Sequence, residues 1–384
     1  MAAETDAVDV LIVGAGFAGS LAAIALGRAG HKVMLVDIHA ASPRTLFRAE
    51  KLSGDQVDLL EKLGMLDVFK AASVRIPEFI NTRGGHVIDR SKVEEYGLLY
   101  PDMIDLLRAH MPAGVFKQGR IADIELSGDR QRVVLTDGET IRARLVVLAT
   151  GQGEALCRKL GFQRRQLHPQ DTICVGFSLR PPAAGFRFPG LIAYGERFGD
   201  GVDYLTLFPL DDGTMRGNLF MFSDIRDPRL DDLRGRGLPA LLDIQPGLRR
   251  WLDGCEWIGK AAVLGVELSR NDDAVRDGVV LIGDAFRISC PSVGTGLSCA
   301  LSDVVQLREH VSDWLKTPGM EAAKINSFYT DAIKAARDAD AHRMAIKRRF
   351  MCRAAPLSYL YVAAHFTWRI LRHWLRRALP TPQT

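Results

Sequence analysis

The feature that most constrains the fold is a glycine-rich turn between two apolar runs, in DVLIVGAGFAGSLAAIALGRAGHKVMLVD (9–37). The continuous apolar runs at 10–13 and 33–36 predict strands buried on both faces, as in a parallel sheet. The Ala- and Leu-rich stretch between them predicts a helix that ends near Gly30. This strand–helix–strand unit indicates an α/β fold with a Rossmann-like parallel sheet.

The turn itself fits the spacing G-x-G-x-x-G, which is typical of dinucleotide-binding sites. The first glycine permits the tight turn, the second lets backbone approach a pyrophosphate, and the third lets the helix pack on the strand. The helix N-terminus offers free amides to the phosphates, and the acid that ends the second strand can hydrogen-bond the adenosine ribose. We expect the dinucleotide to contact Gly14, Gly16, Phe17, Ala18, Gly19 and Asp37.

A second glycine-containing stretch, GDAFRISCPSVGTG (283–296), follows a buried strand predicted at 279–284. The carboxylate of Asp284 can accept hydrogen bonds from sugar-like hydroxyls, and a helix predicted after Gly294 directs its N-terminal amides toward the same cleft. Such a helix end favours negative charge, which a reduced flavin carries. We interpret the stretch as the flavin half of one FAD site, not as a second phosphate loop.

Arg48 precedes a helix predicted at 52–63, in FRAEKLSGDQVDLLEKLG. Its guanidinium is suited to bidentate contact with a pyrophosphate. The alternative is a solvated charge beside Glu50.

Three blocks together resemble the class A FAD-dependent monooxygenases of the p-hydroxybenzoate hydroxylase type: VGAGFAG, RAEKLSGDQVDLLEKLG and GDAFRISCPSVGTGLSCALSDV. Their order and spacing match, over roughly residues 8–70, 100–160 and 265–310. The resemblance implies FAD as cofactor, with NAD(P)H and O₂ as co-substrates. It places Asp284 on the ribityl chain and the remaining flavin contacts at Pro291, Gly294, Gly296 and Leu297.

The chain departs from this family where nicotinamide is handled. In ATGQGEALCR (149–158), Thr150 replaces the family's acid. No second strand–GxGxxG–helix unit is apparent, so a nicotinamide would visit transiently, or a separate flavin reductase would supply electrons. Arg287 stands where the family commonly has His, and it is the polar residue that we expect beside the flavin, with Pro291, as the catalytic group.

The middle of the chain changes to alternating strands, which predict an antiparallel sheet with one face free for a ligand. In TICVGFSLR the apolar side chains Ile173, Val175, Phe177 and Leu179 share one face, and Cys174 is expected in the core. The pattern predicts two interleaved domains and a helical tail. We assign 1–72, 99–165 and 265–316 to FAD binding, 73–98 and 166–264 to the substrate, and 317–384 to a helical C-terminal region.

Aromatic residues on the predicted antiparallel strands are candidates for an apolar substrate pocket. Core packing is an equally good explanation of their pattern. The residues are Tyr204, Phe208, Phe220 and Phe222.

Composition excludes several classes of protein. A net charge of +4 does not provide the basic surface of a nucleic-acid-binding protein. The six cysteines show no zinc spacing, so we expect no metal and a reduced, cytoplasmic protein. The N-terminus is not a signal peptide, and no run of about 18 apolar residues predicts a membrane span.

The tail after Asp340 contains no acidic residue and combines arginines with aromatic residues. Trp368, Leu371 and Leu375 recur at helical spacing. One interpretation is an amphipathic helix that contacts an anionic membrane. The other is a C-terminal helix packed on the body, with its arginines in solvent.

We therefore expect an FAD-dependent monooxygenase, a hydroxylase acting on an apolar aromatic or quinone-like small molecule. One alternative is a flavin-dependent reductase or dehydrogenase of the same fold, such as a prenyl-chain reductase. Another is a flavin-binding protein without turnover that associates with a membrane or a partner.

Overall fold

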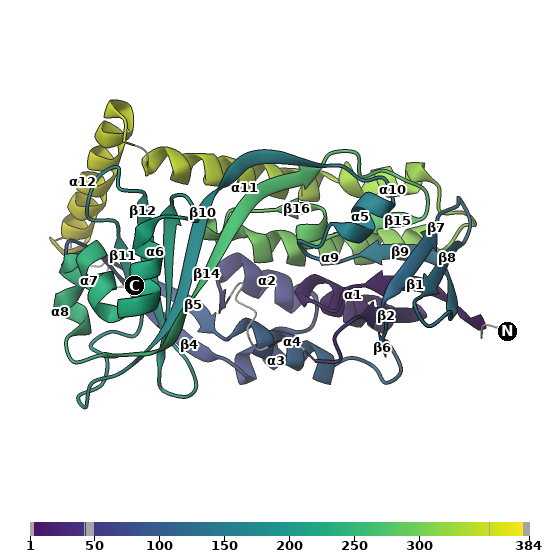
Figure 1. Cartoon of the computed structure of the whole chain (residues 1–384), viewed down its shortest axis with the longest axis horizontal. Coiled ribbons are helices and arrows are strands. Elements are labelled where there is room, and N and C mark those ends of the chain that lie inside the picture. Colours follow the sequence, from purple (N-terminus) through teal and green to yellow (C-terminus); the bar gives the residue numbers. More distant parts are fainter. Residues whose placement is uncertain (1–3, 42, 44–49, 353, 379–384) are drawn as a thin grey trace.

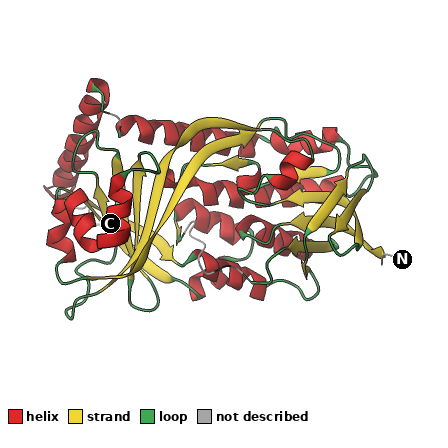
Figure 2. Cartoon of the chain, in the orientation of Figure 1, coloured by secondary structure: helices red, strands yellow, loops and turns green. Residues whose placement is uncertain are grey.

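The computed structural model describes residues 4–41, 43, 50–352 and 354–378, which form two β-sheets with helices packed on both (Figure 1). Figure 2 shows that the helices and strands are interleaved along the whole length of the molecule. The predicted α/β class, with a parallel sheet, an antiparallel sheet and a helical C-terminal region, is confirmed.

The first sheet has the order β6-β2-β1-β9-β8-β7, with β15 paired to β9. Its strands are β1 (Glu4–Val13), β2 (Val33–Asp37), β6 (Phe116–Gln118), β7 (Ile121–Glu125), β8 (Gln131–Leu135), β9 (Thr140–Leu148) and β15 (Val279–Leu281). The neighbouring strands β2, β1, β9 and β15 run parallel. The Gly14 turn, Ala149 and Gly283 therefore lie at the same carboxyl edge of the sheet, where α/β folds bind ligands.

Helices cover this sheet because the apolar runs of β1 and β2 are buried on both faces. A capping box of Ser53 and Gln56 starts the helix that was predicted at 52–63. The helices around this sheet are α1 (Phe17–Arg28), α2 (Gly54–Lys62), α3 (Leu66–Ala71), α4 (Tyr100–Ala109), α5 (Ala155–Lys159), α9 (Thr295–Trp314) and α10 (Ala322–Tyr329).

The second sheet has the order β16-β14-β10-β13-β12-β11-β4-β5-β3, and all its pairs are antiparallel except β11 with β4. Its strands are β3 (Lys51–Leu52), β4 (Val74–Arg83), β5 (His86–Gly97), β10 (Arg164–Arg180), β11 (Leu191–Tyr194), β12 (Val202–Pro209), β13 (Met215–Phe222), β14 (Glu256–Asn271) and β16 (Arg287–Ile288).

Short helices pack on one face of the second sheet: α6 (Pro228–Arg236), α7 (Leu238–Ile244), η1 (Pro246–Leu248) and α8 (Arg249–Leu252). Residues 238–252 do not form one continuous helix, because Pro246 cannot continue α7 and a 3₁₀ turn follows it.

Two predicted domain boundaries fall inside long strands. The boundary at 165/166 lies in β10 and the one at 264/265 lies in β14, because these two strands stay paired from Arg164↔Asn271 to Arg180↔Glu256. Figure 1 shows the two strands as long curved ribbons, side by side, that reach from the second sheet toward the first. The two sheets are therefore joined by continuous strands.

The C-terminal region forms α11 (Ala332–Met351) and α12 (Pro356–Ala378). α11 packs against α9 and against η3 (Pro291–Val293), whereas α12 packs against β5. In Figure 1, α11 extends along one side of the molecule and α12 lies at the end opposite the N-terminus. α11 thus connects the first sheet's helices to the region of the second sheet.

Candidate functional site

A cavity of about 980 Å³ extends from the carboxyl edge of the first sheet to one face of the second sheet. This volume is at the upper end of the usual range for ligand sites, about 300–1,000 Å³. Most residues that the sequence predicted for the site line it: Gly14, Gly16, Phe17, Ala18, Asp37, Asp284, Pro291, Gly294, Gly296, Leu297, Tyr204, Phe208 and Phe220. Gly19, Arg287 and Phe222 are not part of the lining, and Arg48 lies outside the described residues.

The glycine turn has the steric properties that a phosphate-binding turn requires. Gly14 has φ +104°, and a Cβ there would lie 2.5 Å from the carbonyl oxygen of Ala149. A Cβ on Gly19 would lie 1.9 Å from the carbonyl oxygen of Gly14, so Gly19 serves helix–strand packing. A Cβ on Gly16 would meet only the Tyr100 hydroxyl, at 3.4 Å, and Gly16 faces the cavity.

Asp37 and Arg108 lie at the end of the cavity formed by the glycine turn. Asp37 Oδ2 accepts a hydrogen bond from the Ala15 amide at 2.6 Å, and its Oδ1 accepts one from His39 at 2.8 Å. Arg108, on α4, donates to the carbonyl of Ala40 at 2.6 Å and also lines the cavity. The sequence reasoning missed Arg108, because α4 contains no motif that marks it.

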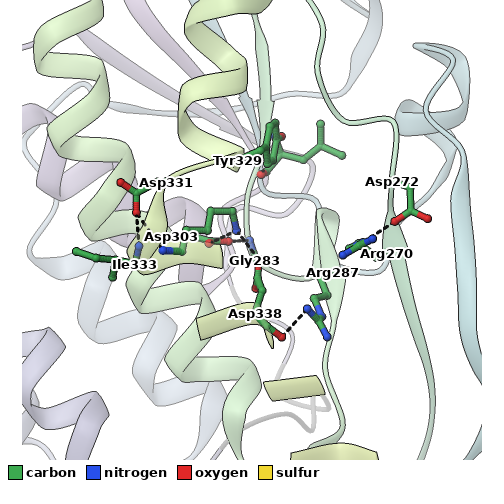
Figure 3. A network of polar contacts seen from close by, with 11 residues as sticks. Arg270, Asp272, Gly283, Arg287, Asp303, Tyr329, Asp331, Ile333 and Asp338 are labelled. Atoms are coloured by element: carbon green, nitrogen blue, oxygen red, sulfur yellow. Dashed lines mark hydrogen bonds and ion pairs between the residues drawn. The ribbon is translucent and has the colours of Figure 1, made fainter. Parts of the chain in front are cut away.

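A cluster of charged side chains on α9 and α11 supports the loop at 283–297 (Figure 3). Asp303, on α9, accepts a hydrogen bond from the Gly283 amide at 2.8 Å and one from Lys334 Nζ at 2.6 Å. Asp338 lies 3.3 Å from the same Nζ. Burial alone would lower the pKa of Lys334, but the two carboxylates outweigh it and raise that pKa, so the lysine stays charged.

Arg287 takes part in this supporting layer rather than in the cavity. It lies in β16, which pairs with the end of β14, and its guanidinium donates to the carbonyl of Asp338 on α11 at 2.7 Å (Figure 3). The geometry therefore does not bring Arg287 to the cavity, contrary to the sequence prediction, because the edge pairing directs its side chain toward α11.

The structure shows which face of the second sheet meets the cavity, and it corrects the prediction for Phe222. Ile173 and its alternating partners on β10 pack beneath α6–α8, so the opposite face carries the cavity, and Cys174 lines it. Phe222, the last residue of β13, packs with Leu268 and Cys290 beyond the cavity. The predicted alternation of side chains along β10 was correct, but the helices that cover one face decide which face meets the cavity.

A buried ion pair faces the cavity between the two sheets. Arg216 donates to both oxygens of the Glu50 carboxylate, at 2.6 and 3.1 Å, and Glu50 lines the cavity. Burial raises the pKa of Glu50, although Arg216 opposes that shift. The block RAEKLSG contained Glu50, but its partner is 166 residues away and was not predictable from spacing.

Tyr204 and Arg348 form the polar part of the aromatic wall. The Tyr204 hydroxyl donates to the carbonyl of Ser292 on η3, and its ring packs against Phe220 at 4.9 Å between centroids. The guanidinium of Arg348, on α11, lies over the Tyr204 ring at 4.8 Å and 3.5 Å from the carboxylate of Asp203. Arg348 is a residue that the sequence reasoning assigned only to a basic tail.

The buried carboxylate of Asp203 should make stability depend on pH. Burial raises its pKa from 3.8 to about 6, against the opposing effects of Arg348, Ser292 and Cys352. The folded protein then binds the proton more tightly than the unfolded chain, so the free energy of unfolding should fall as pH rises from about 4 to 6, by about 3 kcal/mol. Urea unfolding across this pH range should show the loss of unfolding free energy in the wild type and not in Asp203→Asn. A difference between the two proteins that stays constant with pH would contradict it.

Comparisons with known proteins agree with this geometry. A family model described as "FAD binding domain" matches residues 7–175, and one described as "Squalene epoxidase" matches residues 266–345. Rifampicin monooxygenase from Rhodococcus hoagii is 28% identical over 331 residues, which cover 78% of this chain. The chain is thus similar to class A FAD-dependent monooxygenases. It spans 62% of the length of that relative, less than two thirds.

One further relative and one solved structure are similar to this flavoprotein. Menaquinone reductase from Mycobacterium tuberculosis is 29% identical over 77% of this chain and 74% of its own. The crystal structure of p-nitrophenol 4-monooxygenase from Pseudomonas putida DLL-E4 has a TM-score of 0.78 and 18% identity, and covers 97% of this chain and 98% of its own. That structure has the same fold as the flavoprotein.

The described residues of the flavoprotein fit FAD. Gly16 leaves room for a pyrophosphate at the N-terminus of α1, where the Phe17 amide donates to the Tyr100 hydroxyl at 3.2 Å. Gly294 has φ +67° and starts α9, whose first turn faces the cavity at Gly296 and Leu297. Among the described residues, no cluster of three or more His, Cys, Asp or Glu side chains is arranged to hold a metal.

Proposed function

We propose that the flavoprotein is a monooxygenase that uses NAD(P)H and O₂ to hydroxylate an apolar, aromatic or quinone-like small molecule. The observation that carries this proposal is the continuity of the cavity, which joins the glycine turn and the 283–297 loop to the aromatic face of the second sheet. Its volume leaves room for a second molecule beside the cofactor. In the overall reaction, one oxygen atom of O₂ enters the substrate and the other leaves as water with two electrons from NAD(P)H.

We assign the following roles to the residues of the cavity. Gly14, Gly16 and the first amides of α1 bind the pyrophosphate, and Asp37 binds the ribose. Asp284 binds the ribityl chain, and Pro291 with the start of α9 contacts the flavin ring. Bound FAD supplies the redox chemistry, whereas the chain orients the substrate and excludes water. Tyr204, Phe208 and Phe220 supply the apolar wall for the substrate ring.

NAD(P)H would bind at this site only transiently, or a separate flavin reductase would supply the electrons. Thr150 lines the cavity, and its hydroxyl donates to the carbonyl of Gly153 at 3.2 Å. An uncharged side chain therefore occupies the position where the family's acid stands.

The experiment that tests the function is product analysis under ¹⁸O₂. The holoenzyme is supplied with NADH or NADPH and with 2-naphthol, 2-acetonaphthone or 1,4-naphthoquinone. We expect nicotinamide oxidation that a substrate stimulates, with ¹⁸O in the product. A reduced product without ¹⁸O, formed under ¹⁸O₂ and also under anaerobic conditions with oxidation of the nicotinamide, would replace the proposal by the second candidate.

That second candidate is a flavin-dependent reductase, such as one that saturates a prenyl chain. The similarity to menaquinone reductase and the threonine at position 150 favour it. A third candidate, a flavin-binding protein without turnover, would show a bound flavin that neither nicotinamide nor a supplied flavin reductase reduces.

We further propose that the protein is cytoplasmic and contacts an anionic membrane surface through the outer face of α12. No helix among the described residues is long and apolar enough to span a membrane. Val362 and Phe366 pack inward, and Arg369 pairs with Asp89 at 2.8 Å, so α12 is docked on the body. Its outward face nevertheless exposes Leu357, Leu360, Trp368, Leu371, Trp374 and Leu375.

Vesicle binding tests this contact. Full-length holoenzyme should sediment with vesicles that contain phosphatidylglycerol, and less with pure phosphatidylcholine vesicles or at high salt. Changing Trp368, Leu371 and Trp374 together to Gln should reduce sedimentation at least about tenfold, because each buries apolar surface in the lipid. Ile333→Gln with Met344→Gln, exposed apolar residues of α11, is the matched control. Equal sedimentation of all three proteins would refute the contact.

A further inference from the structure

Arg348 places a positive charge in the aromatic wall of the cavity. Its side chain is 22% exposed and lines the cavity. Within the described part of the chain, the guanidinium makes no hydrogen bond, and its ion pair with Asp203 is 3.5 Å long. A guanidinium has five N–H donors, and that of Arg348, partly exposed in the cavity wall, can present them to a ligand.

The surroundings of Arg348 fix the orientation of these donors. The guanidinium lies 4.8 Å from the centroid of the Tyr204 ring and 5.8 Å from that of Tyr194. Aromatic faces hold the cation but do not accept its in-plane hydrogen bonds as an oxygen does. Tyr194 is itself anchored, since its hydroxyl accepts a hydrogen bond from Arg369 of α12 at 2.8 Å. The wall is therefore prearranged around the guanidinium.

The charge balance indicates what such a group binds. Asp203 is 3% exposed and neutralises Arg348 when it is ionised. Its pKa of about 6 means that the pair is neutral overall near pH 7.5. A neutral ligand with an acceptor oxygen then gains a charge-assisted hydrogen bond, whereas an anion also meets the carboxylate of Asp203.

We propose that Arg348 determines substrate specificity by donating a hydrogen bond to a carbonyl or hydroxyl oxygen of a neutral aromatic ligand, whose ring packs on the wall that Tyr204 and Phe220 form. This inference rests on the proposed function, because it assumes that the aromatic face of the cavity receives the substrate. It names the substrate class more narrowly as neutral and oxygen-bearing, such as a ketone, quinone or phenol.

Three probes with the same naphthalene ring compare a neutral ketone, an apolar ethyl group and an anion. They are 2-acetonaphthone, 2-ethylnaphthalene and 2-naphthoate. Their dissociation constants are measured at pH 7.5 from the absorbance change of the oxidised holoenzyme, without nicotinamide. We expect the wild type to bind the ketone at least about tenfold more tightly than the ethyl compound, and also more tightly than the carboxylate.

The decisive variant combines Arg348→Met with Asp203→Asn, which removes the pair without leaving a buried charge. In it, the preference for the ketone over the ethyl compound should fall to about onefold. Arg348→Lys should retain part of the preference. The matched control is Arg343→Met with Asp340→Asn, an exposed ion pair on the same helix, which should leave the preference intact.

Three results would overturn the inference: no preference in the wild type, the same preference in the double variant, or no binding of any probe. A stronger affinity for 2-naphthoate than for the ketone would overturn the neutral class. Since no turnover is measured, a failure of the proposed oxygenation would leave the ketone preference in place. The two failures are therefore distinguishable.

Discussion

Gly16→Ala should weaken FAD binding about tenfold to a hundredfold while leaving the fold of the protein unchanged. An added Cβ would meet only the Tyr100 hydroxyl, at 3.4 Å, and the backbone of Gly16 has φ −75°, which alanine adopts without strain. The methyl group would point into the cavity, where the proposed site brings the pyrophosphate close to the backbone. Overpacking of this kind costs about 1–3 kcal/mol, which corresponds to the expected range.

The measurement is the fraction of flavin that the protein retains on dilution, followed by flavin fluorescence, with circular dichroism on the same samples. Gly19→Ala is the matched control, because its Cβ would lie 1.9 Å from the Gly14 carbonyl oxygen and must shift the turn. We expect that variant to lose both stability and flavin. Full flavin affinity in a folded Gly16→Ala protein would show that the pyrophosphate is bound elsewhere.

Lys334→Met should lower the free energy of unfolding by about 3–5 kcal/mol, because it leaves the buried carboxylate of Asp303 and the half-buried carboxylate of Asp338 without their cation. The lysine is 1% exposed, and its Nζ lies 2.6 Å from Asp303 and 4.3 Å from the centroid of the Phe286 ring. Asp303 also accepts the hydrogen bond of the Gly283 amide. Loss of the cation should therefore also loosen the 283–297 loop and reduce flavin retention.

Urea unfolding gives the stability, and flavin retention in native buffer gives the effect on the loop. Lys324→Met is a suitable control: Lys324 donates to the carbonyls of Trp314 and Gly319 at the far end of α9, so we expect a smaller loss of stability and normal flavin retention. Adding Asp303→Asn to Lys334→Met should recover part of the stability. Equal flavin loss in the two lysine variants would mean that the cluster has only a general structural role.

The sequence predicted the parts of the site that depend on local backbone geometry. The Gly14–Gly19 turn, Asp37 and the 283–297 loop each follow a buried parallel strand, and a buried apolar run followed by glycine is a local signal. Parallel strands bring such segments to one edge, so the loop could be joined to the turn although about 270 residues separate them. The parallel topology of the sheet alone thus predicted that the turn and the loop line one cavity.

The polar groups of the second sheet were not predictable in this way. Glu50 meets Arg216, and Asp203 meets Arg348, across separations of more than a hundred residues, and no spacing rule connects them. Arg287 illustrates the opposite error: its position in a flavin motif suggested a catalytic group, but strand pairing with β14 directs it toward α11.

The sequence by itself determined the α/β class, the dinucleotide turn and the similarity to FAD-dependent enzymes, because these depend on periodicity and on glycines at fixed spacing. Only the tertiary structure decided which face of β10 meets the ligand, which charges are buried together and that α11 places Arg348 in the cavity wall. The physical reason is that burial and ion pairing are properties of surfaces brought together by folding. A single segment does not encode its partner.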